Sequence, residues 1–150
     1  RMFAMEIRVM TEKDYAFVYQ LWLSCAGMGL NNLDDSEEGI ARFLKRNPET
    51  CLLTLENNSL IGAILVGTDG RRAYIYHTAV HLYFRRKGVG KALVEQALSA
   101  VKRLGIHKGS LVVFERNELG NRFWQELGFS VRNDLLYRDQ GLTEMIRLDT

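Results

Sequence analysis

The chain has 150 residues, of which 47% are hydrophobic and 25% are charged, and its formal net charge is +2. A chain of this length buries about two-thirds of its unfolded surface in one core, so we expect residues 1–150 to form a single domain. A nearly neutral charge is untypical of nucleic-acid-binding surfaces, so we expect no nucleic-acid partner. Because no apolar run reaches the roughly 18 residues of a membrane helix, we expect no membrane partner either.

The cysteines and the start of the chain indicate the compartment. Cys25 and Cys51 form no CxxC motif and have no His-rich partner cluster, so we expect neither a disulfide framework nor a metal site. Residues 1–5 lack the apolar core of a secretory signal. We therefore expect a cytoplasmic protein in which residues 1–4 are a tag remnant or a disordered start.

Up to residue 48 the pattern predicts one strand and two helices. A short strand over 6–10 precedes Thr11, which is well placed as the N-cap of a helix. The loop 31–36 leads into a second helix, which Asn47-Pro48 ends. The apolar residues that these two helices are expected to turn inward are Tyr15, Val18, Leu21, Trp22, Cys25, Ile40, Phe43 and Leu44.

Three strands joined by tight turns are predicted next. The runs 50–56 and 59–67 flank Asn57-Asn58, which is a two-residue hairpin signal. Asp69-Gly70 marks a second turn into a strand over 73–80, which is rich in aromatic and β-branched residues. These strands should therefore pair in antiparallel fashion.

The second half of the chain alternates helices and strands. A helix over 89–104 has apolar residues at intervals of three and four, and a strand over 109–114 and a helix over 118–127 follow it. Two further strand-like runs lie near 129–138 and 142–148. The whole pattern predicts an α/β (α+β) fold with a mixed, mostly antiparallel sheet of about seven strands and about four flanking helices.

Residues 85–91 form a basic loop between the strand that ends at Val80 and the helix that follows. Gly88 and Gly90 leave backbone N–H groups open to an anion, which the start of a helix also attracts. The loop therefore predicts a site for a phosphate-bearing ligand.

Two other glycine-loop families do not fit this segment. A nucleoside-triphosphate P-loop needs glycine at the position of Arg85 and Ser or Thr at the position of Ala92. The dinucleotide fingerprint needs a small residue where Leu93 stands, and here the loop follows antiparallel hairpins instead of a first βα turn.

The segment 80–93 resembles the acetyl-CoA signature of the GCN5-related N-acetyltransferase family, with the pattern RxxGxG at 85–90. Leu82 stands where that family often has proline, and Arg86 stands where it often has glycine. A second segment, 117–129, is similar to the family's NxxAxxFYxxLGF stretch. Together with the order of the elements, the resemblance covers residues 5–148.

The resemblance implies where acetyl-CoA would bind. It implies a sheet that opens between the strand ending at Val80 and the strand that begins at Gly109, with the pantetheine arm in the opening and the pyrophosphate on the loop amides. The cofactor-binding residues that it implies are Val80, Arg85, Arg86, Lys87, Gly88, Val89, Gly90, Lys91, Asn117, Asn121 and Trp124.

The resemblance also implies an activity, which is transfer of the acetyl group of acetyl-CoA to a primary amine by direct attack in a ternary complex. The acceptor would be a protein N-terminus, a lysine or a small-molecule amine, with no metal involved and with a homodimer as one expected assembly. Two alternatives stay open: a transferase of a longer acyl group, and a non-catalytic acetyl-CoA sensor.

Two residues of the strand 73–80 are candidate catalytic residues. Tyr74 stands where some members of the family carry a glutamate base, and His77 has a side chain that titrates near neutral pH. Strand alternation predicts that the two side chains lie on opposite faces, so that only one of them can face the cleft unless the strand contains a bulge.

Trp124 stands where the family usually has the tyrosine that protonates the leaving thiolate. An indole N–H donates hydrogen bonds but does not give up its proton at these pH values. We interpret Trp124 as a packing wall for the coenzyme, with Tyr137, Tyr83 or solvent as the source of the proton.

An acidic cluster stands at the predicted start of the second helix. Its members are Asp34, Asp35, Glu37 and Glu38. Carboxylates at this place interact favourably with the helix dipole. The alternative is that the cluster binds the amine acceptor.

Overall fold

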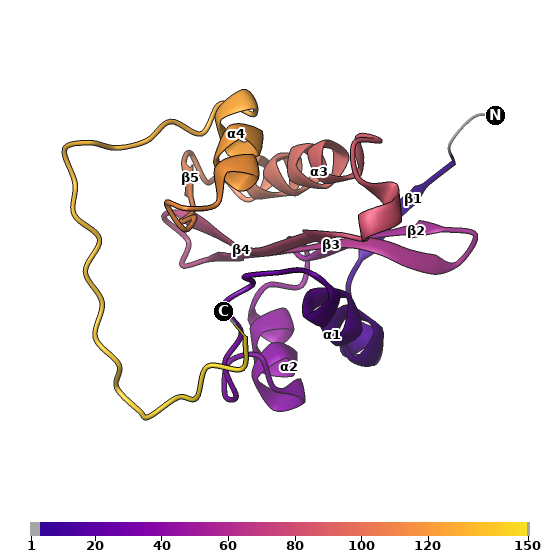
Figure 1. Ribbon diagram of the computed structural model, residues 1–150, viewed down its shortest axis with the longest axis horizontal. Helices are drawn as coiled ribbons and strands as arrows, with labels where there is room; N and C mark the ends of the chain where they lie inside the picture. The colour runs from indigo at the N-terminus through magenta and orange to yellow at the C-terminus, as the bar shows by residue number, and fades with distance from the viewer. Residues whose placement is uncertain (1–3, 150) are drawn as a thin grey trace.

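The structure is a computed structural model that describes residues 4–149. The expectation for residues 1–4 therefore falls almost wholly outside the described residues. One central sheet separates two layers of helices: α1 and α2 cover one face, and α3 and α4 cover the other (Figure 1).

The first strand and the two helices after it lie close to the predicted ranges. Asp14 accepts a hydrogen bond from the N–H of Thr11 at 2.8 Å in a capping box, so a short 3₁₀ turn precedes the first α-helix. Ser36 caps the second helix by accepting from the N–H of Gly39 at 3.0 Å. The elements are β1 (Glu6–Val9), η1 (Glu12–Asp14), α1 (Tyr15–Ser24) and α2 (Glu37–Arg46).

The predicted hairpins are confirmed. Asn57 and Asn58 both have positive φ, 49° and 64°, which a two-residue turn of this hand requires. The strands that the turns join are β2 (Leu52–Glu56), β3 (Ser59–Thr68) and β4 (Ala73–Val80), and each pairs antiparallel with the next.

The second half of the chain supplies the other helical layer and one parallel strand. The sheet order is β1-β2-β3-β4-β5, with β4 and β5 parallel. The α/β fold with a mixed, mostly antiparallel sheet and four helices is therefore confirmed. The elements of this half are η2 (Leu82–Phe84), α3 (Val89–Arg103), β5 (Gly109–Ser110) and α4 (Glu118–Glu126).

The sheet has five strands in residues 4–149, where about seven were predicted. The strand expected over 109–114 ends at Ser110, and the runs 129–138 and 142–148 form no strand. Since the β5 ladder is only two residues long, it offers almost no paired edge for further strands. Residues 129–149, which we call the C-terminal strap, instead cross from α4 to the α1–α2 side (Figure 1).

The end of the strap is held by the loop between α1 and α2. Leu148 donates its N–H to the carbonyl of Leu30 at 2.8 Å, and Asn31 forms an isolated bridge with Arg147. The carboxylate of Asp149 accepts from the N–H groups of Met28, at 3.0 Å, and Leu30, at 2.5 Å. The strap is thus fixed at its end while most of its length is exposed.

Apolar side chains form a separate core on each face of the sheet. The core on the α1 and α2 side contains Val18, Leu21, Trp22, Leu30, Ile40, Leu44, Leu53, Leu65 and Ala79. The core on the α3 and α4 side contains Ile61, Ile64, Val66, Ile75, Val89, Leu93, Val94, Ala97 and Val101. Because β3 and β4 supply side chains to both cores, these two strands are the rigid base on which the loop 85–91 is built.

Two kinds of feature are absent from the described residues. In residues 4–149 no helix is both long and apolar enough to cross a bilayer. The same part of the chain contains no group of three or more His, Cys, Asp or Glu residues arranged to hold a metal ion.

Candidate active site

The strands β4 and β5 separate soon after they meet. Their ladder consists of Ala73 with Gly109 and Tyr74 with Ser110, whereas β4 continues to Val80. Val80 stands opposite Gly62 of β3, and the neighbouring hydrogen bond runs from the His81 N–H to the Ile61 carbonyl at 2.8 Å. Val80 and Gly62 are therefore a non-hydrogen-bonded pair, and the N–H and C=O of Val80 point away from β3. The sheet therefore opens beside the second half of β4, as predicted.

A bulge in β4 changes the predicted directions of the candidate bases. Ile64 pairs with Thr78 and Val66 with Ile75, so two residues of β4 stand opposite the single Leu65 of β3. The alternation of side chains therefore shifts by one residue between Tyr74 and His77. Both face the α1 and α2 side, where Tyr74 packs on Tyr76 and His77 packs on Trp22. The prediction of opposite faces is wrong for this reason.

His77 is anchored to a buried carboxylate. Its Nε2 lies 2.6 Å from Oδ1 of Asp35, and only 13% of the His77 side chain is exposed. The other carboxylate oxygen of Asp35 accepts from the N–H of Asn31 at 2.9 Å, and the ring of Trp22 meets the imidazole edge to face at 4.8 Å. Because Nε2 is held by Asp35, Nδ1 is the ring nitrogen of His77 that can bind another group.

Tyr74 has the properties of a hydrogen-bond donor and not of a base. Burial raises its pKa to about 12, with further contributions from Tyr137 and Tyr76. Its hydroxyl is therefore neutral at physiological pH and cannot take up a proton. The interaction with Tyr137 brings one of the predicted alternative proton sources from the strap to β4.

The loop 85–91 has the backbone of an anion site. Arg86 has a φ of 63°, which costs a residue with a side chain about 1 kcal/mol and explains why glycine is common there in the family that the segment resembles. Gly88 has a φ of 82°, is the N-cap of α3, and would have nothing within 4 Å of an added Cβ. Space for a ligand therefore lies directly over this glycine.

The first turn of α3 offers unpaired backbone donors. Gly88 caps the helix without a side chain, and the first bond of the helix runs from the Ala92 N–H to the Gly88 carbonyl at 3.0 Å. The amides of Val89, Gly90 and Lys91 therefore have no partner within the helix. The side chain of Val89 is only 1% exposed and packs in the core, so Val89 can contribute only its backbone to a ligand.

The loop and the first turn of α3 carry four exposed cations, Arg85, Arg86, Lys87 and Lys91. Arg85 does not point toward the start of α3. Its Nε donates to the Val80 carbonyl at 3.1 Å, and its Nη2 lies 3.6 Å from the sulfur of Cys25 at the end of α1. The guanidinium thus closes the opening beside Val80 and occupies a main-chain group that was predicted to bind the pantetheine arm.

The two predicted asparagines fix the turn before α4. Asn117 caps this helix by accepting from the N–H of Gly120 at 2.9 Å. Asn121 donates from Nδ2 to the carbonyls of Asn117, at 2.8 Å, and Phe114, at 3.0 Å. Both side chains are therefore engaged in shaping the 114–117 turn.

Trp124 packs at the base of α4 against the core on that face. It lies edge to face with Phe123 at 4.9 Å and with Phe129 at 5.2 Å. An added Cβ at Gly90 would meet the ring of Phe123 at 3.1 Å. Gly90 is therefore needed for the close approach of α3 and α4, which joins the two resembling segments in space.

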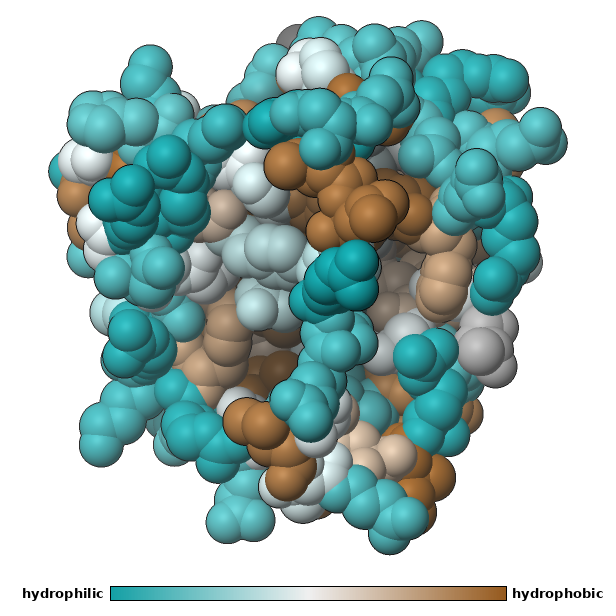
Figure 2. Space-filling model, turned by 90° about the vertical axis from the view of Figure 1, so that its left-hand side faces the viewer, coloured by the Kyte–Doolittle hydropathy of each residue, from teal (hydrophilic) through white to brown (hydrophobic). Residues whose placement is uncertain are grey.

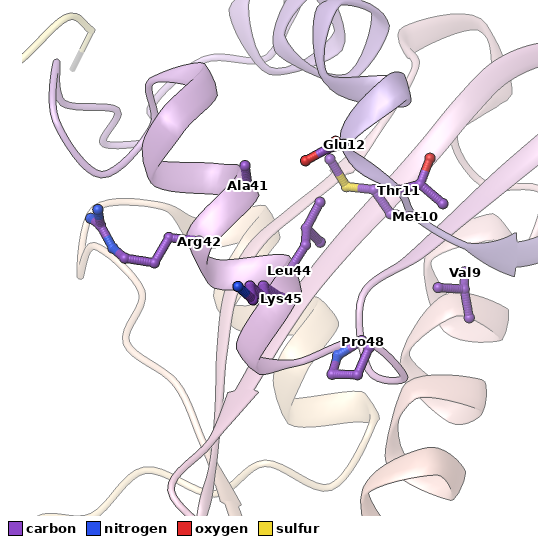
Figure 3. Close-up of a pocket in the computed structure, with 9 residues that line it drawn as sticks. All are labelled: Val9, Met10, Thr11, Glu12, Ala41, Arg42, Leu44, Lys45 and Pro48. Atoms are coloured by element: carbon purple, nitrogen blue, oxygen red, sulfur yellow. The ribbon is translucent and has the colours of Figure 1, made fainter.

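A separate groove lies away from these residues. It has a volume of about 590 Å³ and is bounded by α2 and by the chain between β1 and η1 (Figure 3). None of the predicted site residues lines it. Its lining residues are Val9, Met10, Thr11, Glu12, Ala41, Arg42, Leu44, Lys45 and Pro48.

Sequence reasoning missed three participants of the site. Asp35 is predicted only as a member of the acidic cluster at the start of the second helix, whereas it is 4% exposed and paired with His77. Cys25 was expected only as a core residue, and Phe123 only as part of a motif. No local pattern marks these contacts, because each joins segments that are far apart in the sequence.

Known proteins match this chain in sequence and in structure. The model of the acetyltransferase (GNAT) family matches residues 15–129. An acetyltransferase of Pectobacterium atrosepticum is 30% identical over 125 residues, which cover 83% of this chain and 87% of the relative.

Two solved structures share the fold. Ard1 from Thermoplasma volcanium has 26% identity and a TM-score of 0.74, with 86% of this chain and 84% of that chain covered. PaiA N-acetyltransferase from Thermoplasma acidophilum, solved in complex with coenzyme A, has 21% identity and a TM-score of 0.77, with 86% of this chain and 91% of that chain covered. The chain is thus an acyltransferase that belongs to the acetyltransferase (GNAT) family.

Proposed function

We propose that the protein transfers the acetyl group of acetyl-CoA to a primary amine by direct attack in a ternary complex. The observation that carries this proposal is the opening between β4 and β5, which leads from the edge of β4 at Val80 to the amides at the start of α3 that have no partner within the helix. We also propose that the protein is cytoplasmic. Its two cysteines, Cys25 and Cys51, are free thiols, as expected in a reducing compartment.

The residues of the loop 85–91 fit the pyrophosphate of such a donor. Gly88 leaves open space, the amides of residues 89–91 point out of the helix, and the helix dipole favours negative charge there. We assign the pantetheine arm to the exposed edge of β4 at Val80. Arg85 would have to release the Val80 carbonyl for this arm to bind there, so its side chain acts as a gate.

His77 is the better of the two candidate bases. A primary amine with a pKa near 10.4 is mostly protonated at neutral pH, and freeing it costs about 4.6 kcal/mol. Asp35 holds Nε2 of His77 and leaves Nδ1 to accept a proton from the amine, directly or through water. Tyr74, whose pKa is raised to about 12, serves as a donor to the thioester or the thiolate.

The alternative of a non-catalytic sensor depends on Trp124, which cannot protonate the leaving thiolate. Tyr137 supports a catalytic role for the protein, because it is one of the predicted alternative proton sources and lies close enough to Tyr74 to affect the pKa of that side chain. A thiol with a pKa near 8.5 is also a fair leaving group without an acid.

The proposal is tested by incubating the protein with acetyl-CoA and a mixed library of primary amines and peptides, followed by mass analysis. The expected result is an acetylated amine with one free CoA formed for each product. A parallel series with propionyl-CoA and longer acyl-CoA donors decides the acyl chain. CoA binding without any acylated amine would support the sensor and contradict the proposed activity.

A further inference from the structure

An aromatic surface on β4 is left uncovered by the helices. Tyr74 and Tyr76 lie with their rings 4.7 Å apart, and Phe43 of α2 meets Tyr76 edge to face at 5.5 Å. Tyr76 is 49% exposed although it lies in an interior strand of the sheet. Tyr137 of the strap lies near the same two tyrosines, because it contributes to the raised pKa of each and interacts with the Tyr74 hydroxyl. We call these four residues the aromatic wall.

β4, which carries Tyr74 and Tyr76, begins at a hollowed side of the molecule (Figures 1 and 2). This face is bounded by α2 below and α4 above, and the C-terminal strap crosses in front of it (Figure 1). The space-filling view of the same side shows hydrophobic residues inside hollows on both sides of a mostly hydrophilic column (Figure 2). Hydrophobic surface is therefore open to solvent on the side of the molecule where β4 begins.

One carboxylate gives the wall a negative charge. Asp34 is exposed, accepts from Nδ2 of Asn31 at 3.0 Å, and forms no ion pair within residues 4–149. Asp34 precedes Asp35, whose carboxylate contacts His77, the neighbour of Tyr76 in β4, so Asp34 lies near this part of the strand. Burial raises the pKa of Tyr76, and the charges of Tyr137 and Asp34 raise it further. The other acidic residues nearby differ: Asp35 is paired with His77, and Glu37 and Glu38 lie in the first turn of α2.

The aromatic wall also has a fixed place relative to the reaction. Tyr74 is the last residue of β4 that pairs with β5, so the wall begins where the sheet opens. His77 lies on the same face because of the β4 bulge. An amine that approaches the opening from this face would therefore pass the wall before it reaches His77.

We infer that the aromatic wall and Asp34 bind a second cationic centre of the acceptor, and that the acceptor is a linear aliphatic diamine or polyamine. Neutral tyrosine rings attract an ammonium group through their faces, and a carboxylate at the edge adds charge complementarity. One amine of the molecule would be held there while the other is acetylated beside His77. This inference rests on the proposed acetyl transfer and names the substrate class of the same site.

The test compares 1,5-diaminopentane with hexylamine, which has the same chain of heavy atoms but one charge. We expect kcat/KM for the diamine to exceed that for hexylamine by roughly tenfold or more. Asp34→Asn and Tyr76→Leu should bring the ratio near one. Tyr76→Phe, which keeps the ring, should preserve the preference, as should Glu95→Gln, which removes an exposed carboxylate from α3 on the other face of the sheet.

Equal kcat/KM values for the two amines in the wild type would overturn the inference while leaving the proposed acetyl transfer intact. An unchanged ratio in both Asp34→Asn and Tyr76→Leu would overturn it as well. If neither amine is acetylated, the mixed amine and peptide library decides the proposed function, and calorimetric titration of 1,5-diaminopentane into the CoA-saturated protein decides the inference. Binding that is lost in Asp34→Asn supports it, and the absence of binding to the wild type contradicts it.

Discussion

His77 owes its place to one extra residue in β4. The bulge opposite Leu65 turns His77 to the face that carries Tyr74, and Asp35 then fixes the imidazole through a 2.6 Å contact. Bulges re-aim side chains in this way next to active sites. At the scale of single residues, the position of the candidate base therefore depends on a bulge, which ordinary strand alternation does not provide.

Replacing His77 tests its role as the base. We expect His77→Gln to lower kcat at neutral pH by about a hundredfold, because proton transfer to a positioned base contributes on the order of that factor. The free energy of unfolding, measured in parallel, separates this loss from damage to the buried pair with Asp35. A variant that stays folded and keeps nearly full kcat would show that His77 is only structural.

Trp124 is expected to act by packing, since its ring lies between Phe123 and Phe129. Trp124→Phe should therefore reduce kcat by less than about tenfold while lowering the melting temperature. Steady-state kinetics with thermal unfolding measures both effects. A loss of kcat beyond about a hundredfold would mean that the indole takes part in the chemistry.

Tyr74 should make the stability depend on pH only under alkaline conditions. Its pKa is raised to about 12 in the folded state, so its contribution is complete below the ordinary value near 10 and is lost as the pH rises toward 12. Between those values the free energy of unfolding should fall more steeply for the wild type than for Tyr74→Phe. Tyr83→Phe, at a tyrosine that is 78% exposed, is the control and should follow the wild type.

At the scale of elements, the sequence predicts the helices and the hairpin strands well, but it does not predict which later segments join the sheet. β4 occupies the predicted range 73–80, and α3 and α4 end within one residue of the predicted positions, because periodicity and turn residues are local signals. The runs 129–138 and 142–148 have strand-like composition but do not join the sheet, since the β5 ladder ends at Ser110 and the second run forms only an isolated bridge between Arg147 and Asn31. Whether a segment becomes a strand depends on an available partner strand, which the composition of the segment itself does not determine.

The C-terminal strap should exchange its amide hydrogens rapidly except at its anchored end. Asp149 accepts from two backbone N–H groups, those of Met28 and Leu30. Asp149→Asn should therefore speed exchange at these two amides by roughly tenfold, as expected for the loss of charge-assisted bonds. Asp134→Asn, which breaks an exposed pair with Arg132 within the strap, is the matched control. Strong protection over residues 130–138 would contradict this picture.

For the whole molecule, the site forms where three parts of the fold meet. β3 and β4 supply a rigid base between two cores, α3 presents its first turn at the end of β4, and α4 packs on that turn through Phe123 and Gly90. The motif around 85–91 and the segment 117–129 were both recognisable in the sequence. The contacts of Asp35 with His77 and of Arg85 with Cys25 were not, because each depends on how distant segments pack.

A calorimetric titration of CoA into the wild type and two glycine variants tests the central claim most directly. Gly88 and Gly105 have nearly the same left-handed backbone, with φ of 82° and 83°, and neither would have a neighbour within 4 Å of an added Cβ. Gly88→Ala and Gly105→Ala should therefore lose similar stability, about 1 kcal/mol each. We predict that the wild type and Gly105→Ala bind CoA equally, and that Gly88→Ala binds it at least about tenfold more weakly, because its methyl group occupies the space proposed for the pyrophosphate. Absence of binding to the wild type, or equal affinities for the two variants, would contradict the account.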